Sequence, residues 1–478
     1  MKQSTLVVFA LLLLSQNLLA QSYTPQIETC ACVVKVDPAL ESRCGYLVVP
    51  ENRNKPAGRR IKLPFFYVKK QGDTTKNITL FTTGGPGYST TANFDSIGAG
   101  HGFLQFGGFI AFDQRGTKKA LPCLDCGEVD IAIKRSYKEH LSKDSLVAEA
   151  VKRCRKRLAV DSSIDLSAYN TMESAADIND LRRALHIEVL TLFGVSYSGG
   201  LMLTVARNHP EGVRALILNS PLPGYVDYDE HALFNINEAL EQLFTNCEAD
   251  STNPVYKDLR QQFHQYFTAI SGKRFNLRYA EKGSTDSFMV TYTNNELLDA
   301  IINRMNTGQV KTVPYVILQL IKGNHETYVR EIINDAFAGN RRLSRGMRYS
   351  VYCTEQIAYA NKDRIKKQDT ILPWLAGYPF NNVNHAICDC WKVKPEAAIA
   401  KTPVYSNIPA LIAAGDIDPW CRPFYNRLIK RTMPNSQLLI IHNQGHTPAL
   451  KVNGVDFVKA FMANPYRKLV ATKDVMVE

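Results

Sequence analysis

A serine, an aspartate and a histidine occur in this chain at positions where they could act together as nucleophile, acid and base. Ser196 lies in the segment 194–199 (GVSYSG), directly after the apolar run 189–193. Asp418 and His446 follow much later, each in a loop that comes after another apolar run. A serine hydroxyl is a weak nucleophile, so it needs a histidine to take its proton and a carboxylate to orient that histidine. The three residues therefore predict hydrolysis through a covalent acyl-enzyme.

Neighbouring residues offer an alternative for each member of this predicted triad. Ser198 also has a glycine two residues after it, Asp416 stands two residues before the favoured aspartate, and His442 lies at the edge of a strand-like run. Ser196 is the better candidate nucleophile because Gly194 precedes it at the spacing of the strand–turn–helix motif that exposes a catalytic serine. Ser198 stands where that motif usually has its second glycine. Asp416 could instead fix its own turn.

A glycine-rich turn early in the chain could supply the remaining part of such a site. The strand-like run 80–83 breaks into the segment 84–87 (GGPG). A turn of this kind can direct a backbone N–H at the negative charge that develops on a carbonyl oxygen, and the residue after the nucleophile supplies a second N–H. We therefore predict that the backbone N–H groups of Gly85 and Tyr197 form an oxyanion hole.

The runs that carry these residues predict the strands of an α/β protein. Short apolar segments bounded by turn-forming or charged residues indicate buried strands. These segments are 45–49, 61–68, 78–82, 109–112, 189–193, 213–218, 409–414 and 436–441. Apolar residues at helical spacing predict a helix over 174–185. About 190 residues separate the strand at 213–218 from the strand before Asp418, whereas one strand–helix–strand unit needs only about thirty.

This surplus predicts an inserted, mainly helical unit that forms a cap over the candidate serine. The stretches 235–244, 257–269, 295–305 and 313–321 have helical patterns. The expected organisation is a signal peptide at 1–20, a first part of the core at 21–225, the cap at 226–393 and a second part of the core at 394–478.

Together these motifs resemble the proline iminopeptidase and tripeptidyl aminopeptidase family. The matching segments are 44–50 (CGYLVVP), 84–87 (GGPG), 112–117 (FDQRGT), 194–197 (GVSY), 415–419 (GDIDP) and 445–446 (GH). The resemblance covers most of the chain, is weakest in the middle third, and is nearer to the secreted, cysteine-bearing tripeptidyl branch. It implies an α/β-hydrolase fold with a mostly parallel sheet, an inserted cap, and serine exopeptidase activity near free N-termini.

An exopeptidase must recognise the free end of its substrate. A cap can enclose the pocket and place a carboxylate opposite the terminal ammonium group. Glu355 and Glu230 are the candidates for that carboxylate, although each could instead be an ordinary surface or salt-bridged glutamate. Two other functions stay open on the same fold: a carboxylesterase or lipase that uses the same triad, and a non-catalytic binding protein.

The start of the chain and its cysteines predict an exported protein. Lys2, the apolar run 6–14 and the small residue Ala20 form a secretory signal, which predicts a secreted or periplasmic location without stable membrane insertion. The 11 cysteines favour disulfides over a metal site, and their odd number leaves at least one free or paired between chains. The pairs available at short sequence separation join residue 123 or residue 126 to residue 154.

The distribution of charged residues limits the classes of binding partner that the sequence predicts. The net charge of +12 comes from scattered basic residues, which argues against a nucleic-acid partner. The expected partner is a peptide substrate with a free N-terminus, with no cofactor and no metal ion. The sequence sets no oligomeric state.

Overall fold

A ten-stranded sheet forms the base of the structure, a computed structural model that describes residues 23–306 and 308–478. The predicted signal peptide at 1–20 lies outside the described residues. In spatial order the strands are β1 (Gln26–Thr29), β3 (Leu40–Pro50), β4 (Arg60–Lys70), β7 (Gly108–Phe112), β5 (Ile78–Thr82), β8 (Leu190–Val195), β9 (Val213–Asn219), β12 (Ala410–Gly415), β13 (Ser436–Ile441) and β16 (Val475–Val477). Neighbours from β7 to β13 run parallel, and the strands at both edges are antiparallel to their neighbours. The mostly parallel sheet of the predicted α/β fold is confirmed.

Both faces of the central strands are buried, which explains why their sequences are continuous apolar runs. In β12, residues 410, 412 and 414 pack into the core on one face, and residues 411 and 413 pack into the core on the other. The first face is covered by α4 (Thr171–Ala184), α5 (Tyr197–Asn208) and α14 (Pro423–Thr432), and the second by α15 (Phe457–Ala463). Two short two-stranded sheets join β2 (Lys35–Val36) to β6 (Ser96–Ile97) and β14 (Lys451–Val452) to β15 (Val455–Asp456).

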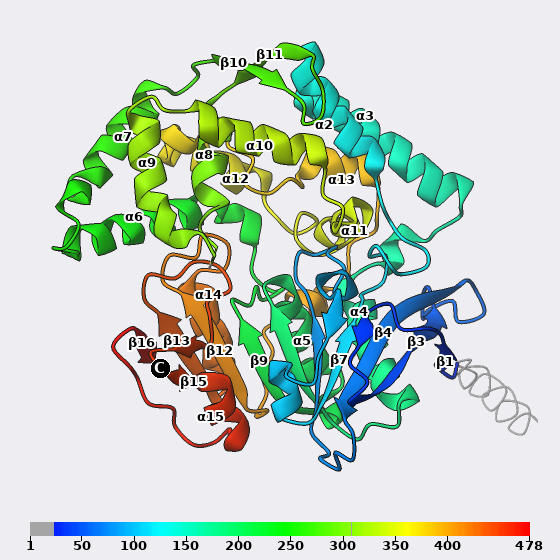
Figure 1. The fold of residues 1–478 in the computed structure, drawn as a ribbon. Coiled ribbons are helices and arrows are strands. Elements are labelled where there is room, and N and C mark those ends of the chain that lie inside the picture. The colour runs from blue at the N-terminus through cyan, green and yellow to red at the C-terminus, as the bar shows by residue number, and fades with distance from the viewer. Residues whose placement is uncertain (1–22, 307) are drawn as a thin grey trace, which may run out of the picture.

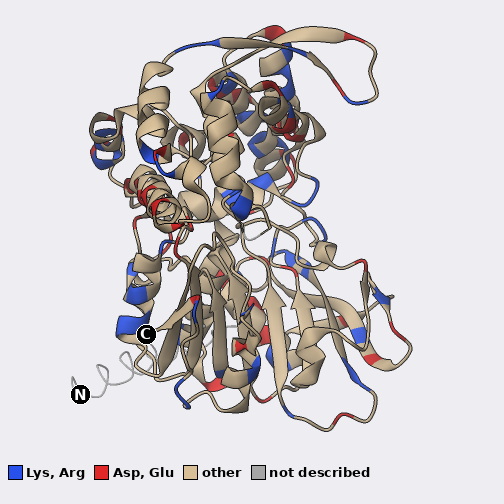
Figure 2. Ribbon diagram, turned by 60° about the vertical axis from the view of Figure 1, so that its left-hand side comes forward, with Lys and Arg blue, Asp and Glu red and all other residues tan. Residues whose placement is uncertain are grey.

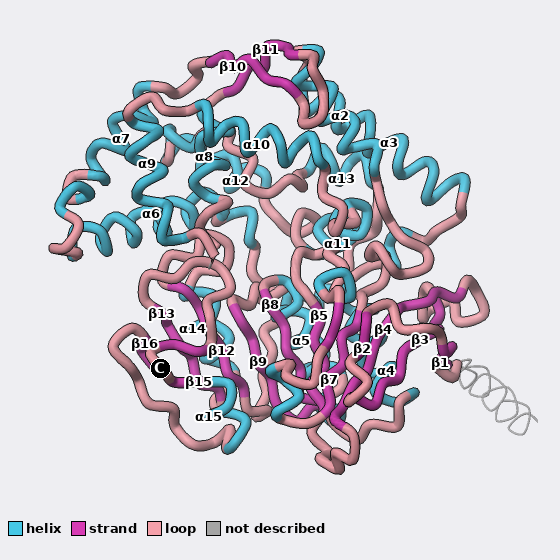
Figure 3. The backbone as a smooth tube through the Cα atoms, viewed as in Figure 1, coloured by secondary structure: helices cyan, strands magenta, loops and turns pink. Residues whose placement is uncertain are grey.

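A layer of helices lies over one end of the sheet (Figure 1). Its elements between the two parts of the sheet are α6 (Ala232–Ala249), α7 (Leu259–Ala269), β10 (Phe275–Ala280), β11 (Ser287–Tyr292), α8 (Asn294–Ile302), α9 (Val313–Ile321), α10 (Glu326–Ala338), α11 (Arg345–Glu355), α12 (Lys362–Ile371) and α13 (His385–Trp391). Figure 3 shows that the β10–β11 hairpin lies on the side of this layer away from the sheet. We call this layer the cap. The four helices predicted from 235 to 321 correspond to α6, α7, α8 and α9.

Two helices from earlier in the chain also belong to the cap. They are α2 (Gly127–Glu139) and α3 (Lys143–Arg155). Tyr137 of α2 packs into the same hydrophobic core as α6 to α10, and α3 packs against α13. A cap that begins at residue 226, as predicted, does not include α2 and α3. Their sequences show which helix face is apolar, but not which layer of the protein that face covers.

Cysteine pairing in the described residues joins Cys32 to Cys44, Cys126 to Cys154, and Cys353 to Cys388. Three disulfides are compatible with an oxidising compartment outside the cytosol.

Acidic and basic residues are spread over both layers (Figure 2). Within the described part of the chain, none of the helices combines the length and the apolar character needed to cross a bilayer.

An ion pair with no solvent exposure ties the loop after β7 to helix α4. The Nε and Nη2 atoms of Arg115 each donate to the Asp177 carboxylate at 2.7 Å. Its Nη1 atom donates to the backbone carbonyls of Glu51 and Ala168 at 2.6 Å. Burial alone would raise the pKa of Asp177, but the adjacent guanidinium groups lower it below its usual value. The pair fixes the segment that follows β7 beside the predicted site.

Replacing this arginine should destabilise the fold strongly. In Arg115→Met, we expect the free energy of unfolding to fall by about 3–5 kcal/mol, because the buried Asp177 charge keeps only Arg53 as a partner and the buried carbonyls of Glu51 and Ala168 lose their donor. Arg135→Met is the matched control, since it breaks the exposed pair with Glu139 and should cost no more than about 0.5 kcal/mol. Urea unfolding with the disulfides intact measures both values, and equal losses would contradict this account.

Candidate active site

Ser196 occupies the sharp turn between the end of β8 and the start of α5. Its backbone has φ 55° and ψ −127°, a conformation that a residue with a side chain adopts only under strain. Two glycines allow the close approach of backbone that the turn requires. A Cβ on Gly84 would lie 2.9 Å from the Cβ of Ser196, and a Cβ on Gly194 would lie 2.5 Å from the carbonyl oxygen of Ser198. The predicted order of strand, strained turn and helix is present.

Ser198, the alternative nucleophile, is fully buried and its hydroxyl is engaged in the turn itself. Its Oγ accepts the backbone N–H of Val195 at 2.8 Å and lies 2.7 Å from the carbonyl oxygen of Thr82 on β5. The side chain therefore ties the nucleophile turn to the neighbouring strand. A glycine at this position could not make those hydrogen bonds. The buried hydroxyl of Ser198 is tolerated here because both contacts satisfy it.

Asp418 and His446 form a direct pair on the loops after β12 and β13. The Nδ1 atom of His446 lies 2.8 Å from Oδ2 of Asp418, and the Asp418 side chain is fully buried. Its other oxygen accepts the backbone N–H groups of Trp420 and Cys421 at 2.8 and 2.9 Å. Burial alone would raise the pKa of Asp418, but His446 and the two backbone N–H groups lower it below its usual value. The carboxylate is thus held ionised beside the imidazole.

The two alternative residues form a separate pair. His442 Nδ1 lies 2.9 Å from Asp416 Oδ2, and the His442 side chain is half exposed. Asp416 also accepts a hydrogen bond from the side chain of Asn246 and one from the backbone of Gln444. Its contacts therefore hold the loop between residues 442 and 446.

Cys421 links the nucleophile turn to the Asp418–His446 pair, and sequence reasoning missed it. The Cys421 thiol lies beside the Ser196 hydroxyl, and burial raises the pKa of this thiol well above its usual value. The sulfur, an imidazole nitrogen of His446 and a carboxylate oxygen of Asp418 all lie within 4.8 Å of one another. The structure thus brings Ser196, Asp418 and His446 into one cluster around this thiol. The position of Cys421, three residues after Asp418 in the same loop, is the signal that could have indicated it.

The predicted oxyanion turn lies directly beside the nucleophile. Since β5 and β8 are parallel neighbours, the turn after β5 and the turn after β8 meet at one edge of the sheet. A Cβ on Gly84 would lie 3.5 Å from the backbone nitrogen of Tyr197, which begins α5. Gly85 has φ 126°, a value that favours glycine. The N–H groups at the start of a helix attract negative charge, as the predicted role of Tyr197 requires.

The predicted oxyanion turn and the residues that follow it are held from both the core and the cap. From the core, Asp113 accepts hydrogen bonds from Ser89 and Thr91. From the cap, Arg348 on α11 donates to the carbonyl oxygen of Gly85 at 2.8 Å. Backbone hydrogen bonds also join Ser344 to Gly87 and Ser89 to Arg342. The cap therefore contributes directly to the position of the turn.

If Gly85 supplies an oxyanion donor as predicted, Arg348 should act as a positioning residue for this turn. In Arg348→Met, we expect kcat to fall by about ten- to a hundredfold with a smaller change in KM, below the loss seen when an oxyanion donor itself is removed. The inhibition constant of a peptide aldehyde, which forms a tetrahedral adduct, should rise by the same factor as kcat/KM falls. Arg342→Met is the control, because Arg342 holds the turn through its backbone carbonyl. A raised KM with unchanged kcat would assign Arg348 to substrate binding instead.

A pocket runs from the oxyanion turn to a buried carboxylate on α11. Its free volume is about 20 Å³, room for about one water molecule, so entry of a peptide end requires the lining side chains or the cap to move. Its lining includes Pro86, Tyr197, Leu222, Val351, Tyr352 and Glu355. The Glu355 carboxylate accepts the backbone N–H and the hydroxyl of Thr171 at 2.5 and 2.6 Å, and the same hydroxyl lies 2.8 Å from the Tyr197 hydroxyl. Burial raises the pKa of Glu355 to about 7. The pocket is mostly apolar and has one carboxylate at its inner end.

Comparison with known proteins agrees with this architecture. The family model described as alpha/beta hydrolase fold matches residues 108–451. The chain belongs to the α/β-hydrolase fold family. It is 20% identical over 409 residues to serine protease Hip1 of Mycobacterium tuberculosis (strain ATCC 25618 / H37Rv), covering 79% of this chain and 76% of that protein. It is 27% identical over 193 residues to tripeptidyl aminopeptidase of Streptomyces lividans, covering 37% of this chain and 35% of that protein. The predicted resemblance to peptidases of this fold is confirmed.

An epoxide hydrolase from Bacillus megaterium in complex with an inhibitor aligns with a TM-score of 0.35 at 15% identity, covering 85% of this chain and 96% of that one.

Glu230, the second predicted carboxylate, is engaged elsewhere in the hydrolase. It accepts the backbone N–H of Asn361 at 2.7 Å and a guanidinium nitrogen of Arg364 at 3.0 Å, at the start of α12. These contacts lower the pKa of Glu230 although burial opposes them. The structure thus places Glu355 in the pocket beside the nucleophile turn and Glu230 in a contact that holds a cap helix.

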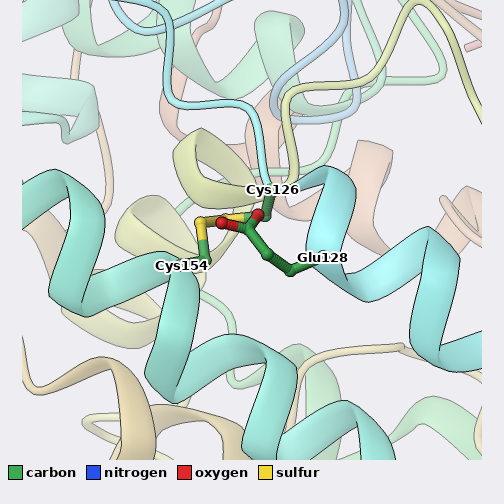
Figure 4. A group of neighbouring side chains, drawn as sticks. All are labelled: Cys126, Glu128 and Cys154. Atoms are coloured by element: carbon green, nitrogen blue, oxygen red, sulfur yellow. A yellow bond between two sulfur atoms is a disulfide. The ribbon is translucent and has the colours of Figure 1, made fainter.

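One further group of side chains in the hydrolase has the residue types of a metal site. Figure 4 shows Cys126 and Cys154 joined by a disulfide, with Glu128 beside them. Sulfur binds metal ions as a thiolate, so the disulfide removes both sulfur ligands. Glu128 pairs with Arg157 at 2.8 Å, which occupies its carboxylate. In this oxidised form the group is a covalent link between α2 and α3.

Proposed function

We propose that the protein is a secreted serine aminopeptidase that hydrolyses peptide bonds near free N-termini. The single observation that supports it best is the pocket that joins the nucleophile turn to Glu355. The names of the two relatives, a serine protease and a tripeptidyl aminopeptidase, support the same class of reaction. Export is supported by the predicted signal at 1–20 and by the three disulfides.

The proposed reaction proceeds through an acyl-enzyme. His446 takes the proton of Ser196 as its oxygen attacks the scissile carbonyl, and Asp418 stabilises the imidazolium that forms. The N–H groups of Gly85 and Tyr197 stabilise the negative charge on the tetrahedral intermediate. His446 then gives its proton to the leaving amine, and a water molecule that His446 activates releases the acyl group.

Glu355 is proposed to bind the ammonium group of the substrate. A buried carboxylate in an apolar pocket loses the hydration of its charge, and a cationic ligand restores a favourable partner. Two hydrogen bonds from Thr171 leave further lone pairs of this carboxylate for a ligand. The mostly apolar lining between Glu355 and the turn suits uncharged side chains of the residues that are released.

The defining experiment compares substrates with free and blocked ends. Aminoacyl and tripeptidyl amides should be cleaved when their N-terminus is free and resist cleavage when it is acetylated. Equal rates on both forms would remove the exopeptidase proposal. Hydrolysis of acyl esters without any peptide cleavage would favour a carboxylesterase that uses the same cluster.

Glu355→Gln should change substrate choice and its pH dependence. For the wild type, the ratio of kcat/KM on an amine-bearing amide to that on an ester without an amino group should fall as pH drops below about 7, because protonation removes the charge of Glu355. The ratio cancels the titration of the triad, which both substrates share. In Glu355→Gln the ratio should be lower and independent of pH. Glu230→Gln is the matched control, and an unchanged ratio in the Glu355 variant would exclude this anchor.

A further inference from the structure

The cluster around Cys421 has a donor set that the proposed hydrolysis does not use fully. A thiol sulfur, an imidazole nitrogen and a carboxylate oxygen, from Cys421, His446 and Asp418, lie within 4.8 Å of one another. The Ser196 hydroxyl lies beside the same sulfur. We propose that this cluster binds a thiophilic divalent cation such as Zn²⁺, which reversibly blocks the candidate nucleophile. The site itself needs only the described geometry, whereas its inhibitory effect rests on the proposed function.

The donor types fit zinc better than magnesium or calcium. Zinc takes thiolate sulfur at about 2.3 Å and imidazole nitrogen at about 2.0 Å in tetrahedral sites, whereas magnesium and calcium require several oxygen ligands. Two such ligands on one ion are roughly 3.5 Å apart, so donor atoms that lie within 4.8 Å of one another must move toward each other by rotation of the side chains to bind it. Cys421 and His446 would be the two principal ligands. The Ser196 hydroxyl or a water molecule would complete the coordination.

Asp418 already holds His446 in the arrangement that zinc ligands adopt. A metal-bound histidine usually donates its other ring N–H to a carboxylate, which fixes the ring and raises its basicity. Here Nδ1 of His446 lies 2.8 Å from the fully buried Asp418 carboxylate. The contact that orients a catalytic base thus equally prepares the second nitrogen to bind an ion. When the ion binds, Cys421 releases its proton to solvent and its sulfur becomes a thiolate ligand.

The surroundings of the thiol restrict the site to a small ion. On one side Cys421 packs against a buried apolar cluster that includes Leu222, Tyr228 and Tyr425. On the other side it meets Ser196, and the His446 side chain retains 18% exposure. A cation that enters along the imidazole would occupy the lone pair that accepts the Ser196 proton. The bound form would therefore be inactive until a chelator removes the ion.

The other unpaired cysteines lack such a donor set within the part of the chain that the structure describes. Cys30, Cys123, Cys247 and Cys390 are half-buried, and none belongs to a group with metal-ligand spacing. The group around Cys126 has its sulfurs in a disulfide. Cys421 is therefore the thiol where a specific effect of the metal is expected, and Cys247 offers a matched control.

Cobalt titration of the oxidised protein tests the site without any activity measurement. Co²⁺ replaces Zn²⁺ in sulfur sites and gives a near-ultraviolet charge-transfer band when a thiolate binds it. In the wild type and in Cys247→Ser, we expect the band to saturate at one equivalent of Co²⁺ and to disappear when Zn²⁺ is added. In Cys421→Ser we expect no band. His446→Ala tests the nitrogen ligand at a partly exposed residue and should weaken cobalt binding by at least about tenfold. No band in the wild type, or the same band in Cys421→Ser, would overturn the site.

Fluorophosphonate labelling tests the inhibitory effect. Zn²⁺ should slow labelling of the wild type, a chelator should restore it, and Cys421→Ser should need at least about tenfold more Zn²⁺ for the same effect, whatever its own labelling rate. Equal sensitivity of both proteins would overturn the inhibitory role of Cys421. A cobalt band in a wild-type protein that neither the probe nor any free-ended peptide modifies would instead refute the proposed function and leave the metal site standing.

Discussion

Ser196→Ala should abolish fluorophosphonate labelling and lower kcat for peptide hydrolysis by a factor on the order of 10⁴ to 10⁶. The reason is chemical: without the hydroxyl no acyl-enzyme forms, and the oxyanion turn can only assist direct attack by water. The expected protein is folded, because the strain at φ 55° belongs to the backbone and alanine keeps the same Cβ. Circular dichroism and the unfolding midpoint confirm folding, and mass spectrometry of the labelled protein measures the loss.

Ser198→Ala separates a nucleophile from a structural serine in the same turn. It removes the hydroxyl contacts to Val195 and to Thr82 on β5. We expect a lower unfolding midpoint and slower turnover, but labelling of one serine per chain should persist. Labelling that survives in Ser196→Ala and disappears in Ser198→Ala would reverse the assignment.

The elements that position the site could be predicted from sequence because their signals are local. An apolar run that ends in a glycine-flanked serine specifies a buried strand, a tight turn and a helix within ten residues or so of chain. The same holds for the loops that carry Asp418 and His446. The fold class follows from these units, since parallel strands with helices on both faces are the stable arrangement for such runs.

The contacts between the cap and the site carry no comparable local signal. Arg348 reaches Gly85 from a residue 263 positions away, and Glu355 reaches Thr171 across 184 positions. The sequence of a cap helix shows which face of the helix is apolar, but not which polar side chain of the sheet layer the helix will contact. The sequence therefore leaves both Glu355 and Glu230 as candidates, and the structure gives the two carboxylates different surroundings. Cys421 was overlooked because a lone cysteine in a cysteine-rich chain indicates a disulfide first.

These long-range contacts couple the two layers of the protein at one place. Helix α11 carries both Arg348, which holds the oxyanion turn, and Glu355, which ends the pocket. A movement of α11 would change the pocket length and the oxyanion turn together. If the proposed function is right, binding of a correct N-terminus at Glu355 would stabilise the position of the helix that also holds the turn.

Asp418→Asn should lower kcat by a factor on the order of 10⁴ with little change in KM. The amide keeps the shape of the side chain, and its oxygen can still accept the N–H groups of Trp420 and Cys421. Its NH₂ group would donate to Nδ1 of His446, which places the ring proton on the nitrogen that must accept the proton of Ser196. Single-turnover measurements of acylation should show the full loss, because the chemical step is affected directly.

Asp416→Asn supplies the matched comparison, because it makes the same change in the second Asp–His pair. His442 is half exposed, so solvent can replace the carboxylate there, and we expect kcat to stay within about tenfold of the wild-type value. Part of that loss would come from a looser loop, since Asp416 also accepts the backbone N–H of Gln444, two residues before His446. A large loss in Asp416→Asn with a small one in Asp418→Asn would mean that the acid works from the other pair, and Ser196 would then need a different base.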